Sequence, residues 1–114
     1  MKKNIYLAQF STGTNINLLP LAAGQIVSRL KQEYQLLEKY NIGEIIFKRM
    51  DPAELIPSLG NISVIGFSCF LWNLNISLKT AQEIRKRFPA ALIIMGGPAM
   101  PKSGKAVKDF LITH

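Results

Sequence analysis

The stretch Ile62–Asn73, ISVIGFSCFLWN, joins a predicted buried strand to an unusual loop. Its first six residues are almost continuously apolar, which is typical of a strand covered on both faces of a sheet. Polar or turn-forming residues normally follow such a strand, yet here Phe70, Leu71 and Trp72 carry bulky apolar groups to the point where the chain should reach the surface. We therefore expect a large apolar ligand at this end of the strand. Packing of the same side chains against a helix or another domain is the alternative.

Strand and helix patterns alternate along the chain on both sides of this stretch. Strands are predicted over residues 4–10, 44–48, 62–67 and 91–95, and helices over 18–40, 51–59, 75–88 and beyond Ser103. The first helix is predicted from an apolar stripe at helical spacing, formed by Leu19, Ala23, Ile26, Leu30, Tyr34 and Leu37. The second should begin at an Asp51 cap followed by Pro52.

This alternation predicts an α/β fold with a parallel sheet and helices on both faces. The commonest small arrangement is the flavodoxin-like (Rossmann-like) doubly wound sheet with strand order 2-1-3-4-5. Since no fifth strand pattern follows, we expect the order 2-1-3-4 and interpret residues 1–114 as one domain cut from a longer protein. A natural four-stranded domain is the alternative. In the first case β-strand four would be an exposed edge, so the isolated chain should dimerise, exchange strands or aggregate.

Composition narrows the function classes. The 114 residues contain no apolar run long enough to span a membrane and no secretory signal at the start. A single cysteine fits a reducing cytoplasm. The net charge of +7 is scattered along the chain, which is typical of solvated helix faces, and no nucleic-acid recognition motif accompanies it. Docking on a partner or a second domain is the other explanation for the charge.

Ligands of doubly wound sheets bind outside the carboxyl ends of the strands. Three loops should meet there, formed by residues 10–15, 68–73 and 96–101. They contain neither GxGxxG nor GxxxxGK[ST], and no acidic residues that would indicate a phospho-receiver. Hydroxyl groups in the first loop leave a flavin phosphate site open, but the apolar start of the next helix favours an apolar ligand. Gly96 and Gly97 would let the backbone approach that ligand closely.

Three segments in this order, LPLAAG (Leu19–Gly24), GFSCFLWN (Gly66–Asn73) and IIMGGPAMP (Ile93–Pro101), resemble the N-terminal cobalamin-binding domain of cobalamin-dependent radical S-adenosylmethionine (SAM) enzymes. The resemblance covers essentially the whole chain. It implies a flavodoxin-like domain that holds cobalamin at the carboxyl edge of the sheet, with the nucleotide tail between the third and fourth strand loops. The cofactor-binding residues that it implies are Phe10, Ser11, Thr12, Asn15, Leu19, Pro20, Ser68, Cys69, Phe70, Leu71, Trp72, Asn73, Gly96, Gly97, Pro98 and Ala99.

One difference from other cobalamin-binding domains concerns the protein ligand of the cobalt. Methionine synthase and mutase domains carry DxHxxG after the first strand, with a histidine that ligates the metal, whereas this loop has no histidine and the chain has only His114. The resemblance therefore implies base-off cobalamin without a protein histidine ligand, and Leu71 or Trp72 over the lower axial position. Cys69 is interpreted as a small packing residue rather than a ligand or nucleophile.

The resemblance also implies a C-terminal radical SAM domain in the same protein, where a CxxxCxxC motif would hold a 4Fe-4S cluster and S-adenosylmethionine would bind. With one cysteine, this chain would bind neither, and we assign it no catalytic residue and no metal ligand. The parent protein is expected to be a methyltransferase. A cobalamin-using radical cyclase or rearrangement enzyme is one alternative, and a non-catalytic flavodoxin-like module that binds flavin or a protein partner is another.

Overall fold

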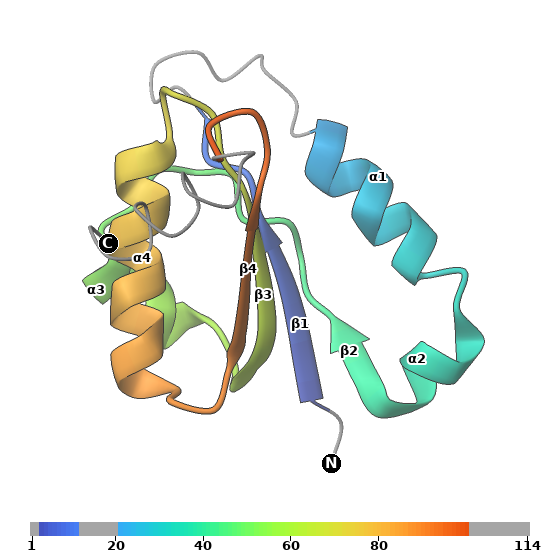
Figure 1. Ribbon diagram of the computed structural model, residues 1–114. Helices are drawn as coiled ribbons and strands as arrows, with labels where there is room; N and C mark the ends of the chain where they lie inside the picture. The colour runs from blue at the N-terminus through green and yellow to red at the C-terminus, as the bar shows by residue number, and fades with distance from the viewer. Residues whose placement is uncertain (1–2, 12–20, 101–114) are drawn as a thin grey trace.

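The computed structural model describes residues 3–11 and 21–100. At its centre is a sheet of four strands, β1 (Lys3–Ala8), β2 (Tyr40–Ile42), β3 (Ile62–Ser68) and β4 (Leu92–Gly96), in the order β2-β1-β3-β4. All three strand pairings are parallel (Figure 1). This confirms the predicted α/β class and the strand order 2-1-3-4 of a flavodoxin-like, doubly wound sheet.

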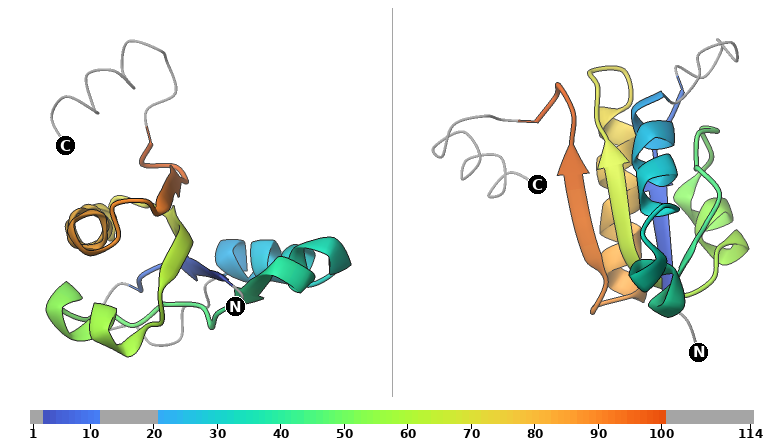
Figure 2. Two further views of the ribbon diagram at one scale, coloured as in Figure 1. Left: turned by 90° about the horizontal axis from the view of Figure 1, so that it is seen from below. Right: turned by 90° about the vertical axis from the view of Figure 1, so that its right-hand side faces the viewer.

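Helices cover both faces of the sheet (Figure 2). Helices α1 (Leu21–Leu30) and α2 (Tyr34–Lys39) lie on one face, and α3 (Pro52–Leu55), the 3-10 helix η1 (Ile56–Ser58) and α4 (Leu74–Arg87) lie on the other. Strand β3 contributes side chains to the hydrophobic cores on both faces of the sheet. Ile65 and Phe67 are buried in the α4-side core, while Val64 packs with the smaller core under α1. No described helix has the length and apolar character needed to cross a membrane.

The predicted single helix over residues 18–40 is wrong. Helix α1 ends at Leu30, a turn follows, and α2 begins at Tyr34. Two members of the expected apolar stripe, Ile26 and Tyr34, are exposed. The reason is geometric: a helix over 18–40 would be roughly 35 Å long, whereas a six-residue strand such as β1 spans only about 20 Å, so the chain must turn back earlier to rejoin the sheet.

The predicted position of the second strand is wrong as well. Strand β2 covers Tyr40–Ile42, not residues 44–48, and it pairs with the start of β1. The following residues continue beside β1 irregularly, with an isolated bridge between Ile46 and Ala8. Gly43, the first residue after β2, lies against Tyr6, and a Cβ there would meet the tyrosine ring.

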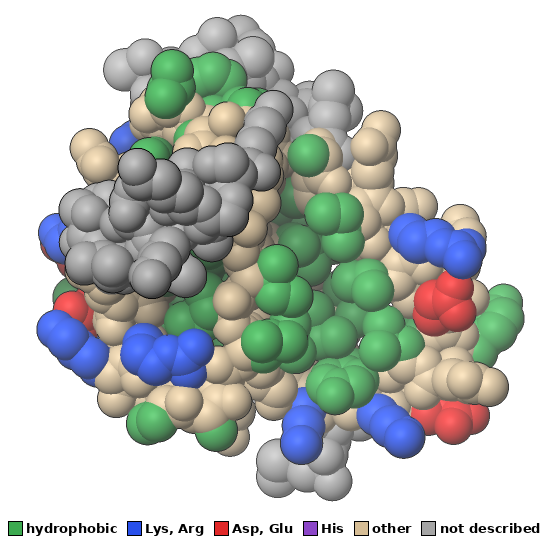
Figure 3. Space-filling model, in the orientation of Figure 1, with side chains coloured by type: hydrophobic (Ala, Val, Ile, Leu, Met, Phe, Trp, Pro, Cys, Tyr) green, Lys and Arg blue, Asp and Glu red, His purple; other side chains and the backbone are tan. Residues whose placement is uncertain are grey.

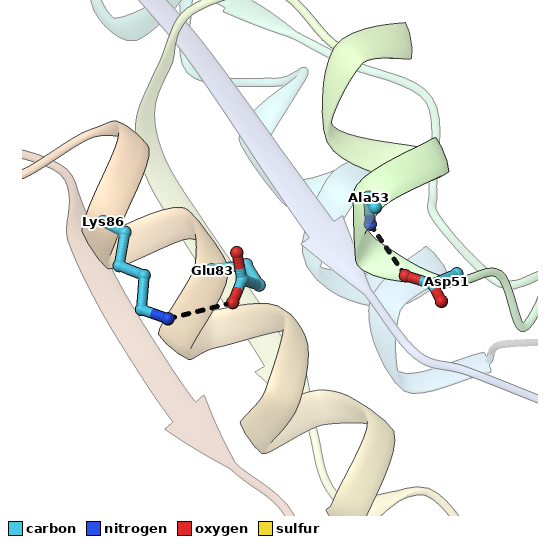
Figure 4. Close-up of polar contacts among 4 residues, drawn as sticks. All are labelled: Asp51, Ala53, Glu83 and Lys86. Carbon is cyan, nitrogen blue, oxygen red and sulfur yellow. Dashed lines mark hydrogen bonds and ion pairs between the residues drawn. The ribbon is translucent and has the colours of Figure 1, made fainter.

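Other local predictions hold closely. Strand β3, helix α4 and strand β4 each begin and end within one residue of the predicted bounds. The Asp51 cap is confirmed, since the Ala53 N–H donates to Asp51 Oδ1 at 2.9 Å (Figure 4). The same figure shows the exposed ion pair between Lys86 Nζ and Glu83 Oε1 of α4, 3.2 Å apart. The helix predicted beyond Ser103 lies outside the described residues.

Candidate functional site

A groove of about 440 Å³ runs along the α1 face of the sheet, down from the carboxyl ends of β3 and β4. Its lining is almost wholly apolar, and Figure 3 shows hydrophobic side chains gathered over the strands between α1 and β4. Strand β3 contributes Val64, Gly66 and Ser68 to it, and β4 contributes Ile94 and Gly96. Helix α1 lines it with Ala22, Ala23 and Ile26. Part of the sheet surface is therefore left uncovered next to the predicted ligand edge.

The groove is open at its upper end because the sheet presents small residues there. Gly66 pairs with Ile94, and the next pair on the same face is Ser68 with Gly96. At Gly96 an added Cβ would meet no atom within 4 Å, so this position faces open space. Within residues 3–11 and 21–100, no side chain fills the carboxyl end of the groove at Gly96, which leaves room for a ligand.

Gly97 serves a different purpose from its neighbour. Its φ of 101° is in the left-handed region, and a Cβ there would lie 2.5 Å from the carbonyl oxygen of Cys69. Only glycine permits both features. The close approach allows the Cys69 N–H to donate to the Gly96 carbonyl at 2.7 Å and the Ala99 N–H to donate to the Cys69 carbonyl at 3.0 Å. The loop after β4 is thereby fixed over the end of β3.

Asn73 organises the neighbouring loop, which joins β3 to α4. Its side chain is fully buried. The Nδ2 group donates to the carbonyls of Phe10 at 3.0 Å and Ser68 at 3.1 Å, and Oδ1 accepts from the Phe70 N–H at 2.8 Å. One amide group thus joins the ends of β1 and β3 to the turn between β3 and α4. The sequence predicts a ligand contact for Asn73; in the structure its amide group makes three hydrogen bonds that organise the loop.

The residues between these anchors, 70–72, form what we call the aromatic turn. The rings of Phe70 and Trp72 stack with their centroids 4.7 Å apart and their planes inclined by 6°. Leu71 is 87% exposed and Trp72 is 50% exposed. These side chains therefore stand at the surface, and Leu71 and Trp72 are not core residues. The predicted apolar surface at the end of β3 is present, and a rigid scaffold holds it in place.

Two predicted site residues point inward. Phe10 is buried in the α4-side core beside Phe67, and Cys69 is fully buried in the same core. Burial raises the pKa of the Cys69 thiol, and a hydrogen bond with Ser77 offsets part of that shift. Its burial in this core fits the interpretation of Cys69 as a small packing residue. Both residues are buried along with their backbone atoms, so neither offers appreciable surface to a ligand in the described structure.

The remaining predicted residues fall into two groups. Thr12, Asn15, Leu19 and Pro20 lie outside the described residues. Ser11 is partly buried, and its N–H donates to the Phe47 carbonyl at 2.9 Å. Pro98 is exposed and Ala99 is partly buried, next to the Gly97 turn.

Sequence reasoning missed two polar residues at this edge. Gln9 Oε1 accepts a hydrogen bond from the Ala23 N–H at 3.1 Å. This backbone donor at the start of α1 is therefore already satisfied. Arg49 donates from Nη1 to the Ser11 and Trp72 carbonyls. Gln9 carried a weak signal as a polar residue at the end of an apolar strand. Arg49 carried none, because its position depends on the irregular path after β2.

Comparison with known proteins identifies relatives that are named methyltransferases. No family model matches the chain. The chain is 29% identical over 83 residues to the cobalamin-dependent radical SAM methyltransferase TokK of Streptomyces tokunonensis. The matched region covers 73% of this chain and 12% of that protein. It is 28% identical over 86 residues to the 2-(S-pantetheinyl)-carbapenam-3-carboxylate methyltransferase of Streptantibioticus cattleyicolor, covering 75% of this chain and 13% of that protein. The predicted resemblance to cobalamin-dependent radical SAM enzymes is confirmed.

The chain therefore spans only about an eighth of the length of these methyltransferases. The segments that carry the resemblance to cobalamin-dependent radical SAM enzymes meet around one site in the described structure. Gly66–Asn73 supplies one side of the groove and the aromatic turn, while Gly96 and Gly97 supply the other. Ala22 and Ala23, from the first of the three segments, line the wall formed by α1.

Proposed function

We propose that this chain is a cobalamin-binding module of a longer radical SAM methyltransferase. The observation that carries the proposal is the groove whose upper end is left open at Gly96 and which lies next to an exposed aromatic turn. Cobalamin has a long nucleotide tail and a broad, largely apolar ring. The groove suits the tail and the aromatic turn suits the ring. The groove's volume falls within the range of about 300–1,000 Å³ that is usual for small-molecule sites.

The polar groups at the site fit the tail of such a ligand. Ser68 lines the groove, and its hydroxyl makes no hydrogen bond with any described residue, so it is available to a ring nitrogen or an amide. Gly96 and Gly97 present backbone atoms without side-chain cover. By contrast, Gln9 already binds an N–H at the start of α1, which makes that helix end a poorer phosphate site for a flavin.

We further propose that cobalamin binds base-off and without a protein imidazole. The described residues include no histidine, and Leu71 and Trp72 offer apolar cover for the lower face of the ring. Bound cobalamin would supply a methyl carrier, while this chain would bind it, orient it and exclude water from beneath it. Nitrogen hyperfine splitting from an axial ligand in the electron paramagnetic resonance spectrum of the reduced complex would contradict this arrangement.

The methyltransferase assignment depends on the relatives, since both are named methyltransferases. Because the chain covers about an eighth of their length, the reaction would require parts of the protein beyond this module. We propose that a radical SAM domain in the same protein, with a 4Fe-4S cluster and S-adenosylmethionine, performs it.

Titration of the purified chain with hydroxocobalamin tests the binding proposal directly. We expect a saturable change in the visible spectrum and retention of the colour through a desalting column. Flavin mononucleotide is the matched control ligand, and it should produce no comparable change. Binding of the flavin and not of the cobalamin would replace this proposal with the flavodoxin-like alternative.

Replacing Trp72 with alanine should weaken cobalamin binding without unfolding the domain. Full burial of a large aromatic side chain is worth about 3 kcal/mol, and half of the Trp72 surface is already buried without ligand. The remaining half corresponds to roughly a tenfold increase in the dissociation constant. Tyr34→Ala is the control, because Tyr34 is an exposed aromatic residue on α2 that does not line the groove. A large loss of melting temperature with unchanged affinity would mean that Trp72 is a packing residue.

A further inference from the structure

Arg49 joins two loops at the carboxyl edge of the sheet. It lies in the irregular segment between β2 and α3, and its side chain is exposed. A single nitrogen, Nη1, donates to the Ser11 carbonyl at 3.1 Å and to the Trp72 carbonyl at 2.9 Å. The guanidinium group therefore connects the segment that follows β1 to the aromatic turn.

Apart from the Arg49 contact, the hydrogen bonds of the aromatic turn with described residues are at its base. Asn73 Oδ1 accepts from the Phe70 N–H, and the Asn73 N–H donates to the Phe70 carbonyl at 3.2 Å. Towards the tip, Leu71 is largely exposed. Among the described residues, Arg49 is the one side chain that bonds to the Trp72 carbonyl.

The charge of Arg49 is not used in an ion pair within the described part of the chain. The two ion pairs there involve Arg29 with Glu33 and Lys86 with Glu83. A charged donor makes stronger hydrogen bonds to carbonyls than a neutral one, and the two hydrogens on one guanidinium nitrogen can serve two acceptors. The arrangement is suited to holding two backbone segments at a set separation.

We propose that Arg49 is a positioning residue that holds the aromatic turn in the orientation that receives the corrin ring. This inference rests on the proposed cobalamin-binding function. Arg49 acts through the backbone of Trp72, so its loss would loosen the turn and leave the apolar cover of the ring poorly oriented.

Trp72 is the only tryptophan, so intrinsic fluorescence reports on the aromatic turn without any cofactor. In Arg49→Met we expect stronger quenching by acrylamide and lower fluorescence anisotropy than in the wild type. Arg49→Lys keeps a cation that can donate to one or both carbonyls and should fall between the two. Lys48→Met is the matched control, because it removes an equal charge from an adjacent exposed residue for which no bond to the turn is present.

Cobalamin titration of the same variants forms the second arm. We expect the dissociation constant to rise about tenfold in Arg49→Met and to stay unchanged in Lys48→Met. Wild-type quenching and anisotropy in a folded Arg49→Met would overturn the positioning role, whatever cobalamin does. A looser turn with unchanged affinity would overturn its role in binding, and equal effects in Lys48→Met would mean that charge alone is responsible. Failure of the wild type to bind cobalamin would instead reject the proposed function.

Discussion

Replacing Gly96 with leucine should strongly weaken cobalamin binding while leaving the domain folded. A Cβ at this position meets no described atom within 4 Å, so we expect the larger side chain to extend into the groove. Glycine weakens strand interiors, so the apo domain should be as stable as the wild type or more so. The leucine would occupy the space that we assign to the nucleotide tail. We expect the dissociation constant to rise by about 10- to 100-fold, because overpacking of a closely fitted site typically costs about 1–3 kcal/mol.

Gly24→Leu is the matched control for this substitution. Gly24 also faces open space, and it lies in α1 but does not line the groove. Affinity should therefore be unchanged in Gly24→Leu, and thermal melting of both variants without ligand should show no loss of stability. Wild-type affinity in a folded Gly96→Leu would show that the groove does not hold any part of the ligand.

Replacing Asn73 with alanine should cause the largest loss of stability among the residues of this edge. The substitution leaves the carbonyls of Phe10 and Ser68 and the N–H of Phe70 without their side-chain partner. Each buried polar group left unsatisfied costs about 1–3 kcal/mol. We expect the free energy of unfolding to fall by about 3 kcal/mol or more, which is a large part of the 5–15 kcal/mol that is typical of a whole domain. Urea denaturation measures this change.

Asn73→Asp separates the donor role from the acceptor role. The carboxylate can still accept from the Phe70 N–H, but it cannot donate to the two carbonyls that Nδ2 contacts. Burial and the two carbonyls should raise the pKa of the new carboxyl group above its unfolded value. The variant should therefore be least stable at neutral pH and regain stability as the pH falls through that raised pKa, where the protonated group can donate again.

Asn75→Asp is the control for this pH dependence, since Asn75 is exposed in the first turn of the same helix. An acidic group there faces the positive end of the helix dipole and should be neutral or slightly stabilising.

The Asn73→Ala prediction has a clear contrary outcome. If Asn73→Ala lowered the free energy of unfolding by less than about 0.5 kcal/mol, a typical surface effect, the three hydrogen bonds would not be holding the loop together.

Local patterns in the sequence were sufficient for part of the fold. The continuous apolar run of β3, the helical spacing of α4 and the apolar run of β4 predicted these elements to within one residue. Asp51 before Pro52 predicted the start of α3, because a cap requires only neighbouring backbone atoms. The candidate edge was also predictable, since strand order follows from the alternation of elements and places the carboxyl ends of β1, β3 and β4 together.

Tertiary structure decided the features that depend on residues far apart in the chain. Helix α1 is shorter than its apolar pattern because the chain must return to pair with β1 at Tyr40. Asn73 proved to be a loop anchor because its partners, Phe10 and Ser68, meet only in the folded sheet. Gly96 and Gly97 are adjacent and identical in sequence, yet one opens a groove and the other permits backbone contact with Cys69. Composition and spacing could predict which residues reach this edge, but not which of them hold it together and which leave it open, because that depends on contacts between separate strands and loops.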